Sequence, residues 1–375
     1  MDSEKYIIVP EIGKIPSFPV KTIPHDEWQD GLLVRTPNWL GDAVMAVPAI
    51  MMLKQILPPC TGLFILTTKG IAPLFEALPF VDRVVTISDP HAFMTARERL
   101  TIKRLQPGAA ILFNNSLRDA ISLRLSRIPK LFGAKARGRS FLMTRTFEFP
   151  KRITAALNKP HQAAKYLSIA CALGAPRWNG ELPEFDLPIY PEELCDDVLR
   201  AMRQEKILLV AGGAAYGAAK RWPAECFREI ARRWIEEKQG FVIASGSKSE
   251  SAIADEILHD LPEKFCVNLA GKTDLSTLMY LLKKADFCIA NDSGVMHLAA
   301  VLGVPGIAPF GSTDPAATSP ISRKWRLLFD KKECAPCFRR ICPKGTRECF
   351  DSITPELLWQ VLNDISSFEK AAVVR

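Results

Sequence analysis

The stretch GLLVRTPNWLGDAVMAVPAIMMLKQIL (31–57) decides the fold, because a short apolar run is followed there by a longer apolar segment. GLLVRT (31–36) predicts a buried strand, and residues 43–57 predict a helix. Trp39, Gly41 and Asp42 lie at the junction. The carboxylate of Asp42 is either a helix-capping group or a group that meets a ligand, since ligands bind at the carboxyl ends of strands in open α/β sheets.

The same alternation of strand and helix continues along most of the chain. Further strands are predicted at 62–68, 81–87, 109–115, 206–213, 240–246, 286–292 and 304–311, and further helices at 70–79, 116–127, 223–239, 275–285, 293–303 and 353–368. Gly240 is the expected residue after the 223–239 helix, and Thr354 is the expected N-cap of the last one. This pattern predicts an α/β fold with parallel sheets.

A proline-rich segment without clear period, WNGELPEFDLPIYPE (178–192), separates two α/β halves. We therefore expect an extension over 1–30, a first domain over 31–185, a second domain over 186–352 and a terminal helix over 353–375. Two halves joined in this way predict a ligand-binding cleft between them.

The net charge of +8 is concentrated in one segment. Ten basic residues oppose only Asp119 and Glu148 there; they are Arg118, Arg124, Arg127, Lys130, Lys135, Arg137, Arg139, Arg145, Lys151 and Arg152. The segment is either a solvated basic face or a surface for an anionic partner such as a nucleic acid, a membrane or a phosphorylated ligand. The absence of a long apolar stretch and of a signal-peptide pattern predicts a cytoplasmic protein.

Two glycine-containing segments in the second half follow predicted strands. VAGGAAYGAAKRW (210–222) brings Gly213 and Lys220 to a strand end, where backbone amides and a cation favour an anion, although it is neither a P-loop nor a GxGxxG motif. CIANDSGVMHLAAVLGVP (288–305) places Asp292 and Ser293 before a helix whose free amides suit a pyrophosphate. Capping by Asp292 and a solvated Lys220 are the structural alternatives.

Four cysteines cluster in CAPCFRRICPKGTREC (334–349) with the spacing C-x2-C-x4-C-x6-C. Four thiolates on a short loop make a candidate structural zinc site at Cys334, Cys337, Cys342 and Cys349. The spacing lacks the two separated C-x-x-C pairs of a zinc ribbon, and disulfides are disfavoured in a reducing cytosol.

In combination and order, PNWLGDAVMAVPAI, NNSLRDA, GGAAYGAAKRWP, NDSGVMHLAAVLGVP, FGSTDP and the Cys-rich segment resemble the lipopolysaccharide heptosyltransferases, most of all the heptosyltransferase II branch. The resemblance covers about residues 31–368. It implies the GT-B fold, with two Rossmann-like domains that face each other across a cleft and a terminal helix that returns towards the first domain. It also implies inverting transfer without a catalytic metal, so that no cofactor is required.

The resemblance implies specific roles. Asp42 matches the family's catalytic aspartate, which acts as the general base. The second domain is expected to bind ADP-heptose through Gly213, Lys220, Thr273, Asp292, Ser293, Gly294, Val295 and His297. The first domain is expected to bind a Kdo- and heptose-bearing lipid A acceptor through Trp39, Arg118, Arg137 and Arg139. The enzyme would then work at the anionic cytoplasmic face of the inner membrane, and no nucleic acid partner is expected.

Other readings predict different features. A nicotinamide-dependent Rossmann enzyme requires GxGxxG after the first strand, where this chain has TPNWLGDAV. A non-catalytic binder of anions or nucleic acid would not need the donor-type segments. Heptosyltransferase I, or a family member that uses another nucleotide sugar, remains an alternative.

Overall fold

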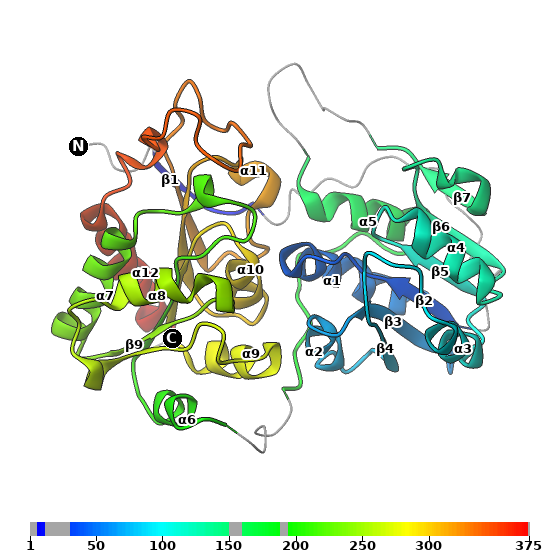
Figure 1. Cartoon of the computed structure of the whole chain (residues 1–375), viewed down its shortest axis with the longest axis horizontal. Coiled ribbons are helices and arrows are strands. Elements are labelled where there is room, and N and C mark those ends of the chain that lie inside the picture. The colour runs from blue at the N-terminus through cyan, green and yellow to red at the C-terminus, as the bar shows by residue number, and fades with distance from the viewer. Residues whose placement is uncertain (1–5, 12–30, 150–159, 188–193, 374–375) are drawn as a thin grey trace. The chain divides into compact units, whose positions relative to one another are not determined.

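The computed structural model describes residues 6–11, 31–149, 160–187 and 194–373, with side chains up to residue 365. The chain divides into two compact units (Figure 1). We call Gly13–Leu187 the N-terminal unit, and Met1–Ile12 with Pro188–Arg375 the C-terminal unit. Among the described residues, no helix is long and apolar enough to span a membrane.

The N-terminal unit contains one six-stranded, wholly parallel sheet in the order β4-β3-β2-β5-β6-β7. Its strands are β2 (Leu32–Arg35), β3 (Leu63–Thr68), β4 (Arg83–Ile87), β5 (Ala109–Leu112), β6 (Lys130–Ala134) and β7 (Arg145–Phe147). Its helices are α1 (Leu40–Lys54), α2 (Ala72–Glu76), α3 (Ala96–Leu105), α4 (Leu117–Leu125) and α5 (Gln162–Ala172). The predicted strands and helices of this half are confirmed, while β6, β7 and a 3₁₀ turn (Arg139–Leu142) form within the basic segment.

The C-terminal unit contains a seven-stranded sheet in the order β1-β13-β12-β11-β8-β9-β10. Its strands are β1 (Ile7–Ile8), β8 (Ile207–Ala211), β9 (Phe241–Ala244), β10 (Cys266–Asn268), β11 (Phe287–Ala290), β12 (Gly306–Phe310) and β13 (Trp325–Phe329). Its helices are α6 (Asp196–Met202), α7 (Ala224–Lys238), α8 (Ser251–Leu258), α9 (Leu275–Lys284), α10 (Gly294–Val301), α11 (Pro315–Thr318) and α12 (Pro355–Val373). All pairings are parallel except that of β1 with β13.

The N-terminal extension contributes a strand that sequence patterning missed. Ile7 and Ile8 pair antiparallel with Leu328 and Leu327 on β13. A two-residue strand carries no periodic signal, so only the sheet edge that it meets identifies it.

Helices α7 and α12 pack against each other, and both contribute side chains to the core of the C-terminal unit (Figure 1). On α7, Phe227, Ile230 and Trp234 recur at helical spacing and are buried, which explains why this segment forms an amphipathic helix. Thr354 caps α12 as predicted, because its Oγ1 accepts a hydrogen bond from the Leu357 amide at 3.2 Å. The return of α12 towards the first domain, like the cleft, concerns how the units sit together and stays a prediction.

The end of α7 corrects one detail. Gln239, not Gly240, takes the left-handed conformation that ends the helix, with φ 53°. Gly240 is instead required for close packing, because a Cβ there would collide with the indole of Trp234. The glycine is therefore explained by space and not by backbone conformation.

Candidate functional site

Both sheets have a point where the strand order reverses. In the N-terminal unit it lies between β2 and β5, and in the C-terminal unit between β8 and β11. The loops that leave two such strands run to opposite faces of the sheet, so a crevice opens at their carboxyl ends, and ligands bind there in open α/β folds. Asp42 follows β2, whereas Lys220 follows β8 and Asp292 follows β11. Most predicted site residues thus lie at the reversal point of their own unit. Thr273, which follows β10, and Arg137 and Arg139, which follow β6, do not.

An ion pair joins the two strand ends in the C-terminal unit. Lys220 Nζ donates to Asp292 Oδ2 at 2.6 Å, and the exposed fractions of the two side chains are 11% and 4%. Asp292 Oδ2 also accepts hydrogen bonds from the hydroxyl groups of Thr313, at 2.6 Å, and Thr318, at 3.2 Å. The carboxylate therefore organises three loops as well as facing the predicted donor site.

Asn291 ties the same loops together, and sequence reasoning missed it. Its side chain is fully buried, donates to the carbonyl of Gly212 at 2.7 Å and accepts from the amide of Trp222 at 2.9 Å. A lone asparagine before Asp292 carries no spacing signal of its own. Only the pairing of β11 with β8 brings it to the Gly212 loop.

The other predicted donor residues differ in their surroundings. Ser293 is the N-cap of α10 and makes no side-chain cap hydrogen bond; its buried Oγ finds no hydrogen-bond partner among the described residues. Gly294 and Val295 are half-buried, and His297, one turn on, is almost fully buried. A Cβ on Gly213 would meet the carboxylate of Glu250, which is the far end of a flexible side chain. Thr273 follows the edge strand β10, and among the described residues no hydrogen bond joins it to Lys220 or Asp292.

A second buried ion pair joins the strand ends in the N-terminal unit. Arg35, the last residue of β2, donates from Nε to Asp119 Oδ2 at 2.7 Å, and both side chains are almost wholly excluded from solvent. Arg35 also donates from Nη2 to Asn38 Oδ1 at 2.7 Å. Because Asn38 precedes Trp39, this arginine fixes the loop that carries the predicted acceptor and catalytic residues.

Asp42 lies in the first turn of α1 at the third helical position and is half-buried. The N-cap position belongs to Trp39, whose side chain makes no cap hydrogen bond and is 59% exposed. Burial, together with the negative charge of Asp42, raises the pKa of Tyr166 on α5 well above its ordinary value. The Asp42 carboxylate therefore lies near an uncharged phenol.

The predicted acceptor arginines separate into two kinds. Arg118 is half-buried with an unpartnered Nε, and Arg137 is exposed in a left-handed turn. Arg139 corrects the expectation of a direct contact, because it is fully buried and donates to the carbonyls of Ala134, at 3.0 Å, and Ser116. Burial lowers the pKa of Arg139 to about 10.

The remaining basic residues are also not one solvated face. Arg124 donates to the carbonyls of Leu142 and Pro129, and Lys135 pairs with Glu148. Lys151 and Arg152 lie outside the described residues.

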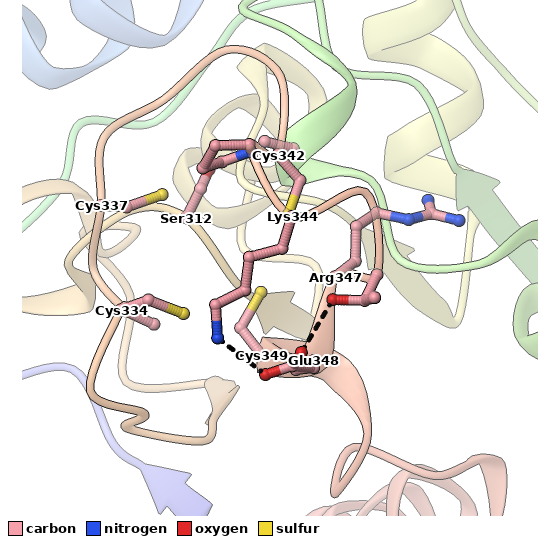
Figure 2. A pocket seen from close by; sticks show the side chains of 12 residues that line it. Ser312, Cys334, Cys337, Cys342, Lys344, Arg347, Glu348 and Cys349 are labelled. Carbon is pink, nitrogen blue, oxygen red and sulfur yellow. Dashed lines mark hydrogen bonds and ion pairs between the residues drawn. The ribbon is translucent and has the colours of Figure 1, made fainter.

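The four clustered cysteines line a cavity of about 70 Å³ in the C-terminal unit (Figure 2). Hydrogen bonds from backbone amides, that of Arg347 foremost, lower the pKa of Cys342, whereas burial raises the pKa of Cys349 to about 11. Across the part of the chain that the structure describes, no three His, Cys, Asp or Glu side chains form a group that could hold a metal ion. The zinc site stays a prediction that these positions do not support.

We predict that Asp119→Ala lowers the free energy of unfolding by about 3–5 kcal/mol, because it leaves the Arg35 guanidinium buried without its partner. Lys135→Ala, which breaks an exposed pair in the same unit, should cost less than about 1 kcal/mol. Urea unfolding of both variants measures the difference. If both variants lost the same free energy of unfolding, burial of the Arg35–Asp119 pair would not increase the cost of breaking it.

We also predict that iodoacetamide modifies Cys342 well before Cys349 at pH 7.5, because the thiolate is the reactive form and its fraction follows the pKa. Raising the pH towards 11 should reduce the difference between the modification rates of Cys342 and Cys349, because Cys349 then also ionises. Peptide mass spectrometry over a time course measures both rates, with the fully buried Cys288 as an unreactive control. Modification of Cys349 at the rate of Cys342 would contradict the assignment.

Comparison with known proteins identifies the family of this chain. Residues 99–347 match the model of glycosyltransferase family 9 (heptosyltransferase). Lipooligosaccharide heptosyltransferase 2 of Haemophilus ducreyi is 30% identical, over 89% of this chain and 99% of the relative. Lipopolysaccharide heptosyltransferase 2 of Salmonella typhimurium is 26% identical over 90% and 99%.

Solved structures show the same fold. The structure of Escherichia coli ADP-heptose lipopolysaccharide heptosyltransferase II aligns with a TM-score of 0.73 at 24% identity, covering 91% of this chain and 99% of that one. This likeness confirms the predicted GT-B class of two Rossmann-like domains. With a family match across most of its length, the chain belongs to glycosyltransferase family 9, the heptosyltransferases, and is a glycosyltransferase.

Proposed function

We propose that this enzyme transfers heptose from ADP-heptose to the heptose- and Kdo-bearing inner core of lipopolysaccharide, with inversion at the anomeric carbon and Asp42 as the general base. The observation that carries the proposal is that Asp42 lies at the strand-order reversal of one unit, and Lys220 and Asp292 lie at that of the other. The relatives named above are heptosyltransferases 2 by name, which favours this acceptor over that of heptosyltransferase I.

The C-terminal unit has the features that a nucleotide diphosphate needs. Lys220 supplies a cation beside Asp292, and the first turn of α10 supplies free backbone amides. The buried Ser293 hydroxyl without a partner supports a ligand contact, because buried polar groups in proteins are nearly always hydrogen-bonded. These groups would stabilise the negative charge that gathers on the leaving ADP.

The chemical step then balances without a cofactor. The acceptor hydroxyl oxygen attacks the anomeric carbon, the bond from that carbon to the phosphate oxygen breaks, and ADP leaves with the electron pair. Asp42 takes the proton of the attacking hydroxyl. Asp42 lies in the first turn of α1, where the helix dipole stabilises negative charge.

Three side chains of the N-terminal unit support an acceptor that is both sugar-like and anionic. The exposed indole of Trp39 offers a stacking surface next to Asp42 in sequence. Arg118 presents a buried, unpartnered Nε beside the Asp119 pair, and a phosphate or carboxylate oxygen would satisfy it. Arg137 is exposed and adds charge.

The turn between β6 and β7 offers a surface for an anionic membrane. Phe141 is 78% exposed and Leu125, at the end of the neighbouring α4, is 61% exposed. Arg127 and Arg137 are exposed on the same segments. Apolar side chains among arginines are typical of peripheral membrane contact, at about 1 kcal/mol per basic residue near the surface.

We expect Asp42→Asn to reduce kcat by about 10²–10⁴-fold, the usual contribution of a general base, while the Kd for ADP stays within about twofold. Single-turnover transfer assays and calorimetric titration measure the two quantities. Glu76→Gln, an exposed carboxylate on α2 of the same unit, is the matched control and should leave both unchanged. Near wild-type transfer by Asp42→Asn would refute the base assignment, and preference for UDP over ADP would refute the donor.

Vesicle sedimentation tests the membrane surface. Phe141→Ser with Arg137→Gln should lower binding to vesicles that contain anionic lipid, because it removes apolar area and charge together, and should leave the Kd for ADP unchanged. Neutral vesicles and a Lys54→Gln variant serve as controls. Lys54 lies on α1, away from this turn, and pairs with Asp82. Undiminished binding of the double variant would exclude this surface.

A further inference from the structure

The ring of Tyr216 contacts two cations at the predicted donor site. Lys220 Nζ is 4.9 Å from the centroid of its ring, and Arg340 Cζ is 5.3 Å from it. Arg340 comes from the Cys-rich segment, more than a hundred residues further along the chain. No sequence motif connects it with Lys220, so its position is a product of folding alone.

Backbone contacts hold the Cys-rich segment against the Lys220 loop. The Arg340 carbonyl accepts from the Ala219 amide at 3.0 Å, and the Phe338 carbonyl accepts from the Tyr216 hydroxyl at 2.9 Å. Gly217 packs directly on the Arg340 backbone, where a Cβ would collide. The Cα of Arg340 is therefore fixed relative to Lys220, and contact with the aromatic ring restricts its guanidinium.

A second cation would add positive charge that the Lys220–Asp292 pair does not supply to the ligand proposed above. The buried Asp292 carboxylate neutralises Lys220 at 2.6 Å. Each phosphate of a nucleotide diphosphate is negative, so a Lys220–Asp292 pair alone offers it no net positive charge. Arg340 is exposed and, among the described residues, has no ion pair with an acidic side chain.

We infer that Arg340 is a further donor-binding residue, whose guanidinium contacts the diphosphate of the nucleotide sugar together with Lys220. The inference rests on the proposed donor and extends it to a residue of the Cys-rich segment. A planar guanidinium suits this task because it donates two parallel hydrogen bonds to phosphate oxygens. The Cys-rich segment then serves the donor site by presenting this arginine.

Calorimetric titration of the full-length protein with ADP and with adenosine tests the inference. Arg340→Gln should raise the Kd for ADP about tenfold, the usual effect of removing one charged hydrogen-bond partner, and should change the Kd for adenosine less than twofold. The affinity for ADP should also depend less steeply on salt concentration than in the wild type. Arg340→Lys should recover part of the loss, because the charge is kept and the planar fork is not.

Arg339→Gln is the matched control. It removes an equal charge from the neighbouring exposed position and should change the Kd for ADP less than twofold. Thermal unfolding of each variant shows whether the C-terminal unit is intact. Tyr216→Leu, which removes the ring but no charge, provides a second route to displacing the guanidinium and should weaken ADP binding selectively as well.

Three outcomes overturn the inference. Wild-type ADP affinity in Arg340→Gln excludes the contact. Equal losses for ADP and adenosine, or a matching loss in Arg339→Gln, indicate a structural or general surface-charge effect. If the wild-type protein itself binds no ADP, the proposed function fails. That result differs from the case in which the wild type binds ADP and Arg340→Gln binds it equally well, which refutes the inference alone.

Discussion

A buried ion pair across the strand-order reversal is the constraint on which each half of this protein depends. In the C-terminal unit Lys220 meets Asp292, and in the N-terminal unit Arg35 meets Asp119. Taking two charges out of water is costly unless further hydrogen bonds satisfy them. Thr313 and Thr318 donate such bonds to Asp292, and Asn114 donates one to Asp119. Arg35 donates further bonds to Asn38 Oδ1 and to the Thr36 carbonyl. The loops are consequently held in one arrangement before any ligand arrives.

Preorganisation of this kind suits a transfer reaction. Groups that stabilise charge on a leaving phosphate act best when they need not move during the reaction. The Gly212–Lys220 loop is held from three directions, by Asp292, by Asn291 and by the backbone of the Cys-rich segment. Trp39, by contrast, is exposed and is not held in this way.

Features that arise from local sequence pattern could be predicted, and features that arise from tertiary contacts could not. Strands such as β8 and β11 are continuous apolar runs, and α7 is strongly amphipathic, so local pattern identified them. The buried positions of Arg139 and Asn291 could not be predicted from the sequence, because burial depends on which other segments pack around a side chain. A basic segment that looked uniform contains a buried arginine, a paired lysine and exposed arginines.

By itself the sequence determined the α/β class, the order of most elements and the family resemblance, since all of these reside in local pattern and motif. It also predicted which strand ends bind ligands. Tertiary structure alone decided which strand ends became neighbours, which charges were buried as pairs, and that Arg340 lies beside the Tyr216 ring. The reason is physical: burial, ion pairing and charge balance depend on segments that strand pairing brings together from distant parts of the chain, such as Ala290 beside Ala211 and Arg35 beside Leu112.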